Sequence, residues 1–269
     1  VLVFELWGKI LMIENVALNL LRAGNLAVGI GLRQARTVDI APAMKTAGFD
    51  WLFIDMEHNS MDLDTAVQIC VAAQAVGISP IVRVPGFQHY HASRVLDGGA
   101  QGIVFPHVDD AKTAAQLVDF CRYPPDGRRS ISGTLPQINF ESHPQKEAAA
   151  AINDATLLVF MLESPEAISN VDAIAAEPGV DALLIGTSDL TMEMGIPGQL
   201  EHPSVVAAYE AMITACKRHH KHPGMGGIYQ PELLQRYVGM GVKLILAGSD
   251  LSLLMSAGKA RVSDIRAAI

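Results

Sequence analysis

Cysteine is scarce in this chain of 269 residues, and the few cysteines lie far apart. Cys70, Cys121 and Cys216 form no Cys-x-x-Cys pair and no closely spaced pattern with histidine. That spacing argues against a structural zinc site. It favours a reducing, cytoplasmic compartment, in which thiols stay unpaired.

A cluster of positive charge is also missing. The formal net charge is −8, and the nearest candidate for a basic patch is Arg128-Arg129. Two adjacent arginines are too few for the electrostatic footprint of a nucleic-acid-binding protein. We therefore expect small-molecule ligands and no nucleic acid.

An uninterrupted apolar run of membrane-spanning length is absent as well. Residues 1–21 are apolar, but Glu5, Lys9 and Glu14 interrupt them, and no small-residue cleavage site follows. This pattern fits neither a signal peptide nor a transmembrane helix, so we expect no membrane association. We interpret residues 1–25 as an N-terminal extension whose helix packs on the bottom of the domain or on a neighbouring subunit.

What the sequence does contain is a regular alternation of apolar strand segments and amphipathic helices. The strands are expected at 26–32, 51–56, 80–84, 102–108, 157–162, 182–186, 224–228 and 244–247. The helices are expected at 38–47, 62–76, 91–96, 109–123, from 164 onward, at 205–219, at 231–238 and from 251 towards 269.

Eight strand–helix units of this kind predict a single (β/α)₈ TIM barrel of class α/β over residues 1–269. The strand segments are apolar throughout, as parallel strands buried on both faces require. An open, doubly wound sheet is the alternative, but no Gly-x-Gly-x-x-Gly motif follows the first strand. The longest irregular stretch, 124–145, has the length of a functional or interfacial loop.

Ionisable residues stand where several of these strands end. Catalytic groups of such barrels lie at the carboxyl ends of the strands, so we expect these side chains to converge. They are Asp55, Glu57, His58, Arg83, Glu163 and Asp189, with Asp250 after the last strand.

The chemistry of this set points to a metal and a 2-oxo acid. Glu163 and Asp189, two carboxylates without a cysteine, suit a hard cation such as Mg²⁺ or Mn²⁺. The cation would polarise the 2-oxo group, Arg83 would share the negative charge of an enolate, and His58 would move the proton. The backbone N–H groups of 187–189 would form an anion nest.

Each of these residues also has a purely structural interpretation. Glu163 could stabilise a helix dipole, Asp189 could cap a turn, Arg83 could serve in a buried ion pair, and His58 could be an ordinary core histidine. Among the other histidines, we place His219, His220 and His222 on the opposite face of the barrel. We place His89, His91 and His107 near its mouth.

Several segments resemble the HpcH/HpaI class II aldolases, which are metal-dependent pyruvate aldolases acting on 4-hydroxy-2-oxo acids. The resemblance extends from about Leu26 to the C-terminal helix and keeps both order and spacing. The matching segments are 47–58, 80–85, 122–127, 162–167, 185–190 and 247–250.

The resemblance implies an enzyme, a carbon–carbon lyase. It joins pyruvate to an aldehyde, or cleaves the product, without an organic cofactor. By position, Glu163 and Asp189 bind Mg²⁺, Mn²⁺ or Co²⁺, Arg83 stabilises the enolate, and His58 is the acid/base residue. Asp97 raises the basicity of the histidine, and Asp55 contacts it. The segment Gly186, Thr187, Ser188 and Asp189, with Arg83, binds the substrate. The family forms hexamers, dimers of trimers in which the last helix is exchanged between barrels.

The chain departs from the family pattern at three places. Met161 stands where many members have a substrate-contacting Gln, and Thr187-Ser188 replaces Pro-Ala. Arg33 and Arg36 occupy a segment that often carries an aromatic residue, where they could bind an acidic substituent or form inter-subunit ion pairs. Hydroxypyruvate therefore stays open as a donor beside pyruvate.

Three other functions compete with this interpretation. A citryl- or malyl-CoA lyase of the same superfamily would need a nucleotide-binding surface, for which no basic or glycine-rich segment is suited. An oxaloacetate decarboxylase resembling macrophomate synthase is a further variant. A non-catalytic barrel that only binds or assembles is the alternative of another class.

Overall fold

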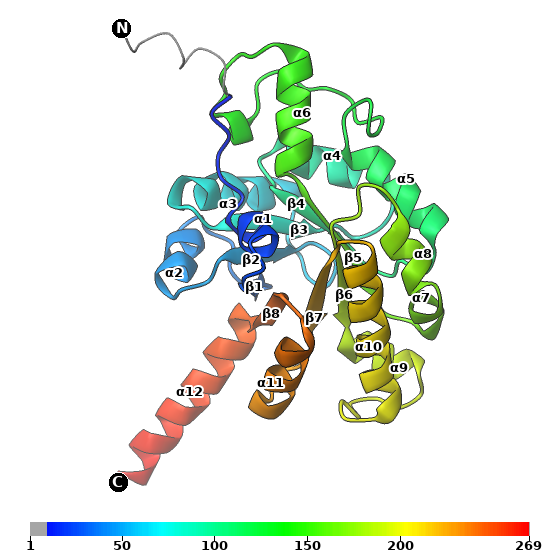
Figure 1. Cartoon of the computed structure of the whole chain (residues 1–269). Coiled ribbons are helices and arrows are strands. Elements are labelled where there is room, and N and C mark those ends of the chain that lie inside the picture. Colours follow the sequence, from blue (N-terminus) through cyan, green and yellow to red (C-terminus); the bar gives the residue numbers. More distant parts are fainter. Residues whose placement is uncertain (1–9, 269) are drawn as a thin grey trace, which may run out of the picture.

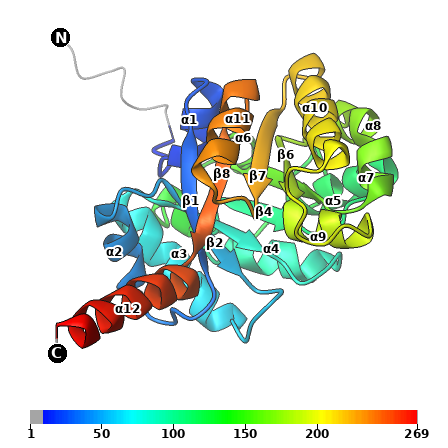
Figure 2. The ribbon, with the colours of Figure 1, turned by 90° about the horizontal axis from the view of Figure 1, so that it is seen from below.

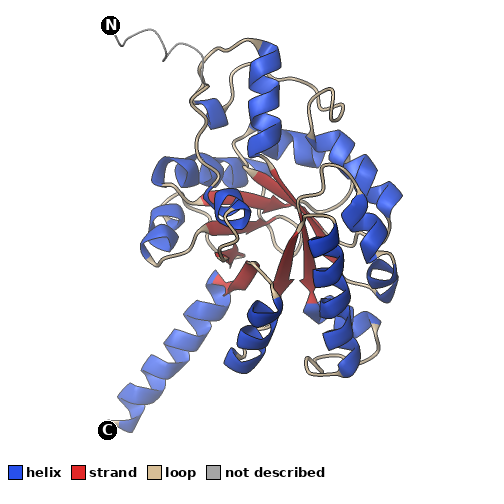
Figure 3. Ribbon diagram, in the orientation of Figure 1, coloured by secondary structure: helices blue, strands red, loops and turns tan. Residues whose placement is uncertain are grey.

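Eight parallel strands form a closed barrel in the order β1 to β8, with helices around it (Figure 1 and Figure 3). The computed structural model describes residues 10–268. The strands are β1 Ala27–Leu32, β2 Trp51–Asp55, β3 Ser79–Arg83, β4 Gly102–Phe105, β5 Leu157–Leu162, β6 Ala182–Gly186, β7 His222–Gly226 and β8 Leu244–Ser249. The predicted (β/α)₈ architecture is thereby confirmed.

Helix α1 precedes the first strand, and one or two α-helices follow each strand. The helices are α1 Val16–Arg22, α2 Ile40–Thr46, α3 Leu63–Val76, α4 His89–Asp97, α5 Ala111–Cys121, α6 Gln145–Ala155, α7 Pro165–Ser169, α8 Val171–Ala176, α9 Thr187–Glu193, α10 Pro203–Arg218, α11 Pro231–Met240 and α12 Asp250–Ala267. The best-predicted helix, α3, has the expected signals: Asp62 accepts a hydrogen bond from the Thr65 N–H, and Gly77 ends the helix with φ 71°. A side-chain cap and a left-handed glycine are the usual helix-ending devices.

Some predicted boundaries are wrong for identifiable reasons. Strand β7 begins at His222 and ends at Gly226, whereas 224–228 was expected, because its sequence His-Pro-Gly-Met-Gly has no apolar run. Helix α4 begins two residues before the expected His91. The helix expected from 164 is divided at Asn170 into α7 and α8.

Helix α1 closes the N-terminal end of the barrel. Leu18 and Leu21 are buried in the cluster that also contains Trp51, the first residue of β2. The indole occupies the space beside Gly29, where an added Cβ would lie 2.2 Å from it. The expectation that the N-terminal extension packs under the barrel is met by α1, whereas residues 1–9 of the expected helix lie outside the described residues.

Helix α12 stands apart from the rest. It extends away from the barrel in both ribbon views (Figure 1 and Figure 2), and none of its residues is buried. Its exposed side chains include the apolar Leu254, Met255, Val262 and Ile265. Such a row of exposed apolar residues is unusual for a monomer's surface.

The remaining composition-based expectations concern the thiols and the membrane. Cys70, Cys121 and Cys216 are free and buried, and burial raises the pKa of the Cys121 and Cys216 thiols to about 12. No helix within residues 10–268 has both the length and the apolar character needed to cross a bilayer. The cytoplasmic location itself stays a prediction.

Candidate functional site

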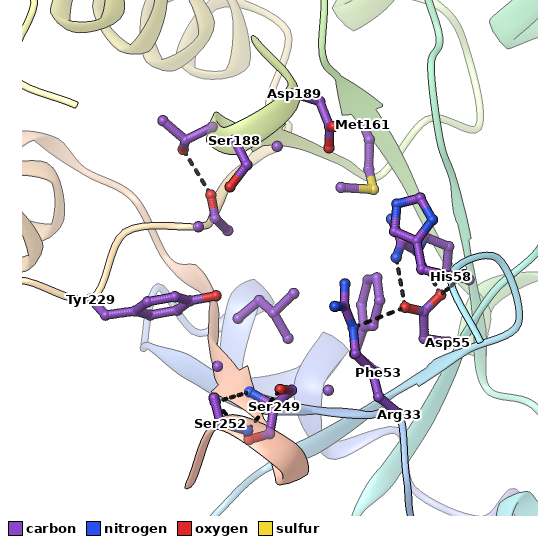
Figure 4. Close-up of a pocket in the computed structure, with 18 residues that line it drawn as sticks. Arg33, Phe53, Asp55, His58, Met161, Ser188, Asp189, Tyr229, Ser249 and Ser252 are labelled. Atoms are coloured by element: carbon purple, nitrogen blue, oxygen red, sulfur yellow. Dashed lines mark hydrogen bonds and ion pairs between the residues drawn. The ribbon is translucent and has the colours of Figure 1, made fainter. Parts of the chain in front are cut away.

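A cavity of about 330 Å³ opens among the carboxyl ends of the strands (Figure 4). Its lining comes from the ends of β1, β2, β3, β5, β6, β7 and β8, so residues distant in sequence meet there. The size lies within the range of small-molecule sites. The lining residues with side chains most relevant to chemistry are Arg33, Asp55, His58, Arg83, Met161, Ser188, Asp189 and Tyr229.

Arg83 joins two carboxylates at the tips of β2 and β3. Asp55 and Arg83 are direct neighbours in the strand register. Arg83 Nε and Nη2 donate to Asp55 Oδ1 and Oδ2 at 2.9 and 2.7 Å, and Nη1 lies 2.8 Å from Glu57 Oε2. Burial acts to raise the pKa of Asp55, but the hydrogen bonds and charge of Arg83 outweigh it and lower this pKa. Asp55 therefore stays ionised and holds the guanidinium in place.

His58 lies at the edge of the same cavity with its ring partly exposed. Its Nε2 is 3.9 Å from Glu57 Oε2. Asp55 contacts His58 through the backbone instead of the ring, since Asp55 Oδ1 accepts a hydrogen bond from the His58 N–H at 3.3 Å. The structure thus makes Glu57 the nearest carboxylate to the imidazole.

Glu163 and Asp189 stand beside each other after β5 and β6. Asp189 lines the cavity, whereas Glu163 is 1% exposed and lies behind Gly186. An added Cβ at Gly186 would be 2.4 Å from Glu163 Oε1, so glycine leaves this carboxylate room. Glu163 Oε2 accepts the His107 N–H at 2.9 Å, but Oε1 has no hydrogen-bond partner.

Glu163 and Asp189 influence each other's charge. Burial first, and then the neighbouring Asp189 charge, raise the pKa of Glu163 to about 6, although the His107 N–H acts in the opposite direction. The two carboxylates, one of them with the orphaned Glu163 Oε1, form an all-oxygen donor set, which fits a hard divalent ion. Within residues 10–268, no three His, Cys, Asp or Glu side chains are grouped as ligands. Water or substrate oxygens would therefore complete the coordination.

The substrate-binding segment at β6 begins a helix. Gly186 is the N-cap of α9, so the backbone N–H groups expected to form a nest belong instead to its first turn. Ser188 lines the cavity. The Thr187 hydroxyl is buried, where it donates to the Gly226 carbonyl at 2.7 Å and contacts the Tyr209 hydroxyl at 2.8 Å. Thr187 thus holds the neighbouring strands and helices together, and only its backbone faces the site.

Asp97 is the predicted site residue that the structure does not bring to the cavity. It ends α4 and accepts a hydrogen bond from Arg129 Nη2 at 2.6 Å. It borders a different surface depression, together with Asp64 and Arg94. Its expected action on His58 therefore has no contact to support it within one chain.

Three of the other histidines have contacts or positions that locate them. His222 begins β7 and His219 pairs with Asp172 at 3.1 Å, both away from the carboxyl ends of the strands. His107, expected near the mouth, has Nδ1 3.3 Å from Glu163 Oε2 and Nε2 3.7 Å from Glu57 Oε1. Its φ of 51° turns the chain sharply after β4.

Sequence reasoning missed the uncharged lining of the cavity. Tyr229, Ser249 and Ser252 border it (Figure 4). Tyr229 was overlooked because only charged residues and histidines were considered at the strand ends, although Tyr229 directly follows the expected strand. Met161 lines the cavity at the position where the family resemblance implies Gln.

Known proteins with similar sequences and structures agree with this architecture. Residues 33–257 match the family model described as HpcH/HpaI aldolase/citrate lyase. A 4-hydroxy-4-methyl-2-oxoglutarate aldolase of Hapsidospora irregularis is 41% identical over 249 residues, 90% of this chain and 91% of that one. A 5-keto-4-deoxy-D-glucarate aldolase of Klebsiella pneumoniae is 35% identical over 211 residues, 78% and 81% of the two chains.

A solved structure gives the same result. The HpcH/HpaI aldolase from Desulfitobacterium hafniense superimposes with a TM-score of 0.88 at 30% identity, over 92% of this chain and 95% of that one. The sequence match extends over most of the chain and the structural match over the whole barrel. This chain therefore belongs to the HpcH/HpaI aldolase/citrate lyase family.

Proposed function

We propose that this protein is a class II, metal-dependent aldolase that cleaves and forms 4-hydroxy-2-oxo acids, with pyruvate or hydroxypyruvate as the donor. The observation that carries the proposal is the orphaned oxygen of Glu163 beside Asp189, at a cavity that also holds Arg83 and His58. Relatives named as aldolases of 2-oxo or 5-keto acids support the reaction class.

Glu163 and Asp189 would hold Mg²⁺, Mn²⁺ or Co²⁺. When bound, the cation would offset the negative charge that develops on the 2-oxo group of the donor. The first-turn N–H groups of α9, at Thr187 to Asp189, lie where a substrate carboxylate can accept from them, and helix N-termini favour such anions. No organic cofactor is part of the proposal.

The protein side chains then carry the charge and proton transfers. In the cleavage direction the C3–C4 bond breaks, the C4 hydroxyl becomes a carbonyl and its proton leaves. The bonding electrons stay on the pyruvate unit as an enolate, which is later protonated at C3. Arg83 has five N–H bonds, and its contacts with Asp55 and Glu57 leave two for a substrate oxygen. His58, open to the cavity, takes and returns the proton.

The test is deuterium exchange at the methyl group of pyruvate in D₂O. With Mg²⁺ the methyl protons are expected to exchange, EDTA should stop the exchange, and His58→Ala should slow it by 10²-fold or more, since general acid–base catalysis is worth about 10²–10⁴-fold. His219→Ala, on the opposite face, serves as the matched control. Absence of exchange with both pyruvate and hydroxypyruvate, while Mg²⁺ is bound, would contradict the proposal.

We further propose that α12 is covered by another copy of the chain, in a hexamer built as a dimer of trimers with this helix exchanged. The support is its exposed apolar face, on which Leu254 and Val262 lie two turns apart.

Leu254→Glu is expected to dissociate the assembly in sedimentation velocity, because it puts a charge into the face that the other copy would cover. Ala260→Glu, on the other side of the helix, should not. If both variants sediment at the same rate as the wild type, this proposal is overturned.

A further inference from the structure

The structure assigns different roles to the two arginines of the loop between β1 and α2. The Arg36 guanidinium donates to the carbonyls of Arg33 and Ala35 at 2.9 Å, and it contacts Asn59 and Ser60 at 3.3 Å. All of these partners are protein groups, and Arg36 does not line the cavity. Arg33 does line it, and its side chain points towards Asp55 (Figure 4). Only Arg33 is therefore placed to meet a ligand.

Within residues 10–268, Arg33 has one ion pair, and it is a long one. The nearest carboxylate oxygen, Asp55 Oδ2, is 3.5 Å from Arg33 Nε, too far for a good hydrogen bond. Both oxygens of Asp55 already accept hydrogen bonds from Arg83. The Arg33 side chain is 45% exposed, so its remaining N–H groups face the open cavity. Among the described residues, Arg33 thus shares its one carboxylate partner, Asp55, with the more closely bound Arg83, and its guanidinium stays available to a ligand in the cavity.

Asp250 fixes the backbone that carries this cation. Its carboxylate accepts the N–H groups of Arg33, Gln34 and Ala35 at 3.0, 2.9 and 2.8 Å. Burial acts to raise the pKa of Asp250, but these hydrogen bonds outweigh it and lower the pKa, so the group stays ionised. A cation on a fixed backbone loses less conformational freedom when it binds an anion. The loop is therefore organised before any ligand arrives.

The position of Arg33 in the barrel sets the shape of the ligand it can contact. Arg33 follows β1, which lies across the eight-stranded ring from β5, the strand that precedes Glu163. A ligand whose 2-oxo acid end lies at β5 and β6 directs its other end towards β1. The cavity lining also includes the apolar side chains of Phe53, Met161 and Leu246. Carboxylates that can hold a cation after β5 and β6, a guanidinium after β1 and an apolar part of the lining fit a molecule with an anionic group at each end.

We infer that Arg33 binds the second carboxylate of a dicarboxylic 4-hydroxy-2-oxo acid, the one contributed by the acceptor. This inference rests on the proposed aldolase function and names its substrate class: the acceptor is a short carbonyl acid. Tyr229, whose hydroxyl points into the same cavity (Figure 4), is placed to donate to that carboxylate as well. Arg33 acts in recognition and takes no part in breaking the carbon–carbon bond.

The test compares two two-carbon acceptors, with and without a carboxylate, and uses the change in their ratio between variants, because the intrinsic reactivities of the two aldehydes cancel in that comparison. Condensation of pyruvate with glyoxylate, which carries a carboxylate, is measured against condensation with glycolaldehyde, which carries a neutral CH₂OH. The full-length wild type with Mg²⁺ is expected to favour glyoxylate in kcat/KM. Arg33→Ala should lower this preference by about 10- to 100-fold, mostly through KM, since a charge-assisted contact is lost. Arg33→Lys should restore part of it.

Arg36→Ala is the matched control, since it removes a neighbouring guanidinium without opening the cavity, and it should leave the preference unchanged. An equal loss for both acceptors in Arg33→Ala, or no loss for either, would overturn the inference. Pyruvate methyl exchange needs no acceptor, so it separates the two levels of the proposal. Exchange with an unaltered acceptor preference rejects the role of Arg33 alone. Absence of exchange in the Mg²⁺-loaded wild type with both pyruvate and hydroxypyruvate rejects the aldolase itself.

Discussion

Glu163→Gln and Asp189→Asn are each expected to abolish metal-dependent turnover, with losses on the order of 10³-fold or more, because a metal ion supplies several kcal/mol of transition-state stabilisation. Each change removes one charge from an all-oxygen site while keeping the shape of the side chain. Mn²⁺ affinity, followed by electron paramagnetic resonance, should fall together with activity. Binding is thereby measured independently of catalysis.

Two exposed glutamates close in sequence to Glu163 and Asp189 provide controls for these variants. Glu166→Gln, in the first turn of α7, and Glu193→Gln, at the end of α9, each remove an exposed charge near the site. Both should bind Mn²⁺ and turn over normally. Gln at position 163 also leaves no buried charge, so the melting temperature of the metal-free protein should not fall. Full Mn²⁺ affinity in either site variant would remove Glu163 or Asp189 from the metal site.

Arg83→Ala is expected to damage both catalysis and stability. Turnover should fall by about 10²–10³-fold, the size of one lost electrostatic stabiliser. The free energy of unfolding should fall by about 3–5 kcal/mol, because Asp55 is 1% exposed and would lose its partner. Urea unfolding and steady-state kinetics measure the two effects. A change confined to KM would instead make Arg83 a ground-state binder.

A double variant separates these two roles of Arg83. Asp55→Asn with Arg83→Met removes both members of the buried pair, so much of the lost stability should return, whereas activity should not. The pH dependence provides a second check. Arg83 lowers the pKa of Asp55 from its ordinary value of 3.8. The ionised Asp55 therefore stabilises the wild-type protein above pH 3.8, and this stabilisation is lost as the pH falls through the lowered pKa. Arg83→Ala should lack this acid-side loss.

The barrel could be predicted from the sequence because most of its strands are continuous apolar runs. Leu157–Leu162 is buried at every position and was predicted with the right limits. The strand His222–Gly226 was misplaced because proline and glycine interrupt the apolar run. Backbone pairing with β6 and β8 holds this segment as a strand although its residues have no strand preference of their own. Tertiary pairing thus overrides local preference in that strand.

The candidate site was predictable to the extent that it consists of charges at strand ends. Parallel strands end at one edge, so Asp55, Arg83 and Asp189 were expected to share a cavity, and all three line it. Asp97 ends a helix instead of a strand and pairs with Arg129 outside the cavity lining, so only the family resemblance supports its role, which stays a prediction. The difference between Arg33 and Arg36 depends on hydrogen bonds that no local pattern encodes.

The closed N-terminal end of the barrel governs the order in which the reactants bind. Trp51, Leu18 and Leu21 pack at the N-terminal end, so in the described part of the chain the cavity opens at the carboxyl ends of the strands, where reactants enter and leave. Glu163 lies deep, at 1% exposure, whereas Arg33 stands near the rim at 45%. Under the proposed function, the donor must then arrive before the acceptor and depart after it. The kinetics would be ordered, with free pyruvate competing directly against the cleavage substrate for the empty enzyme and the carbonyl acid unable to do so.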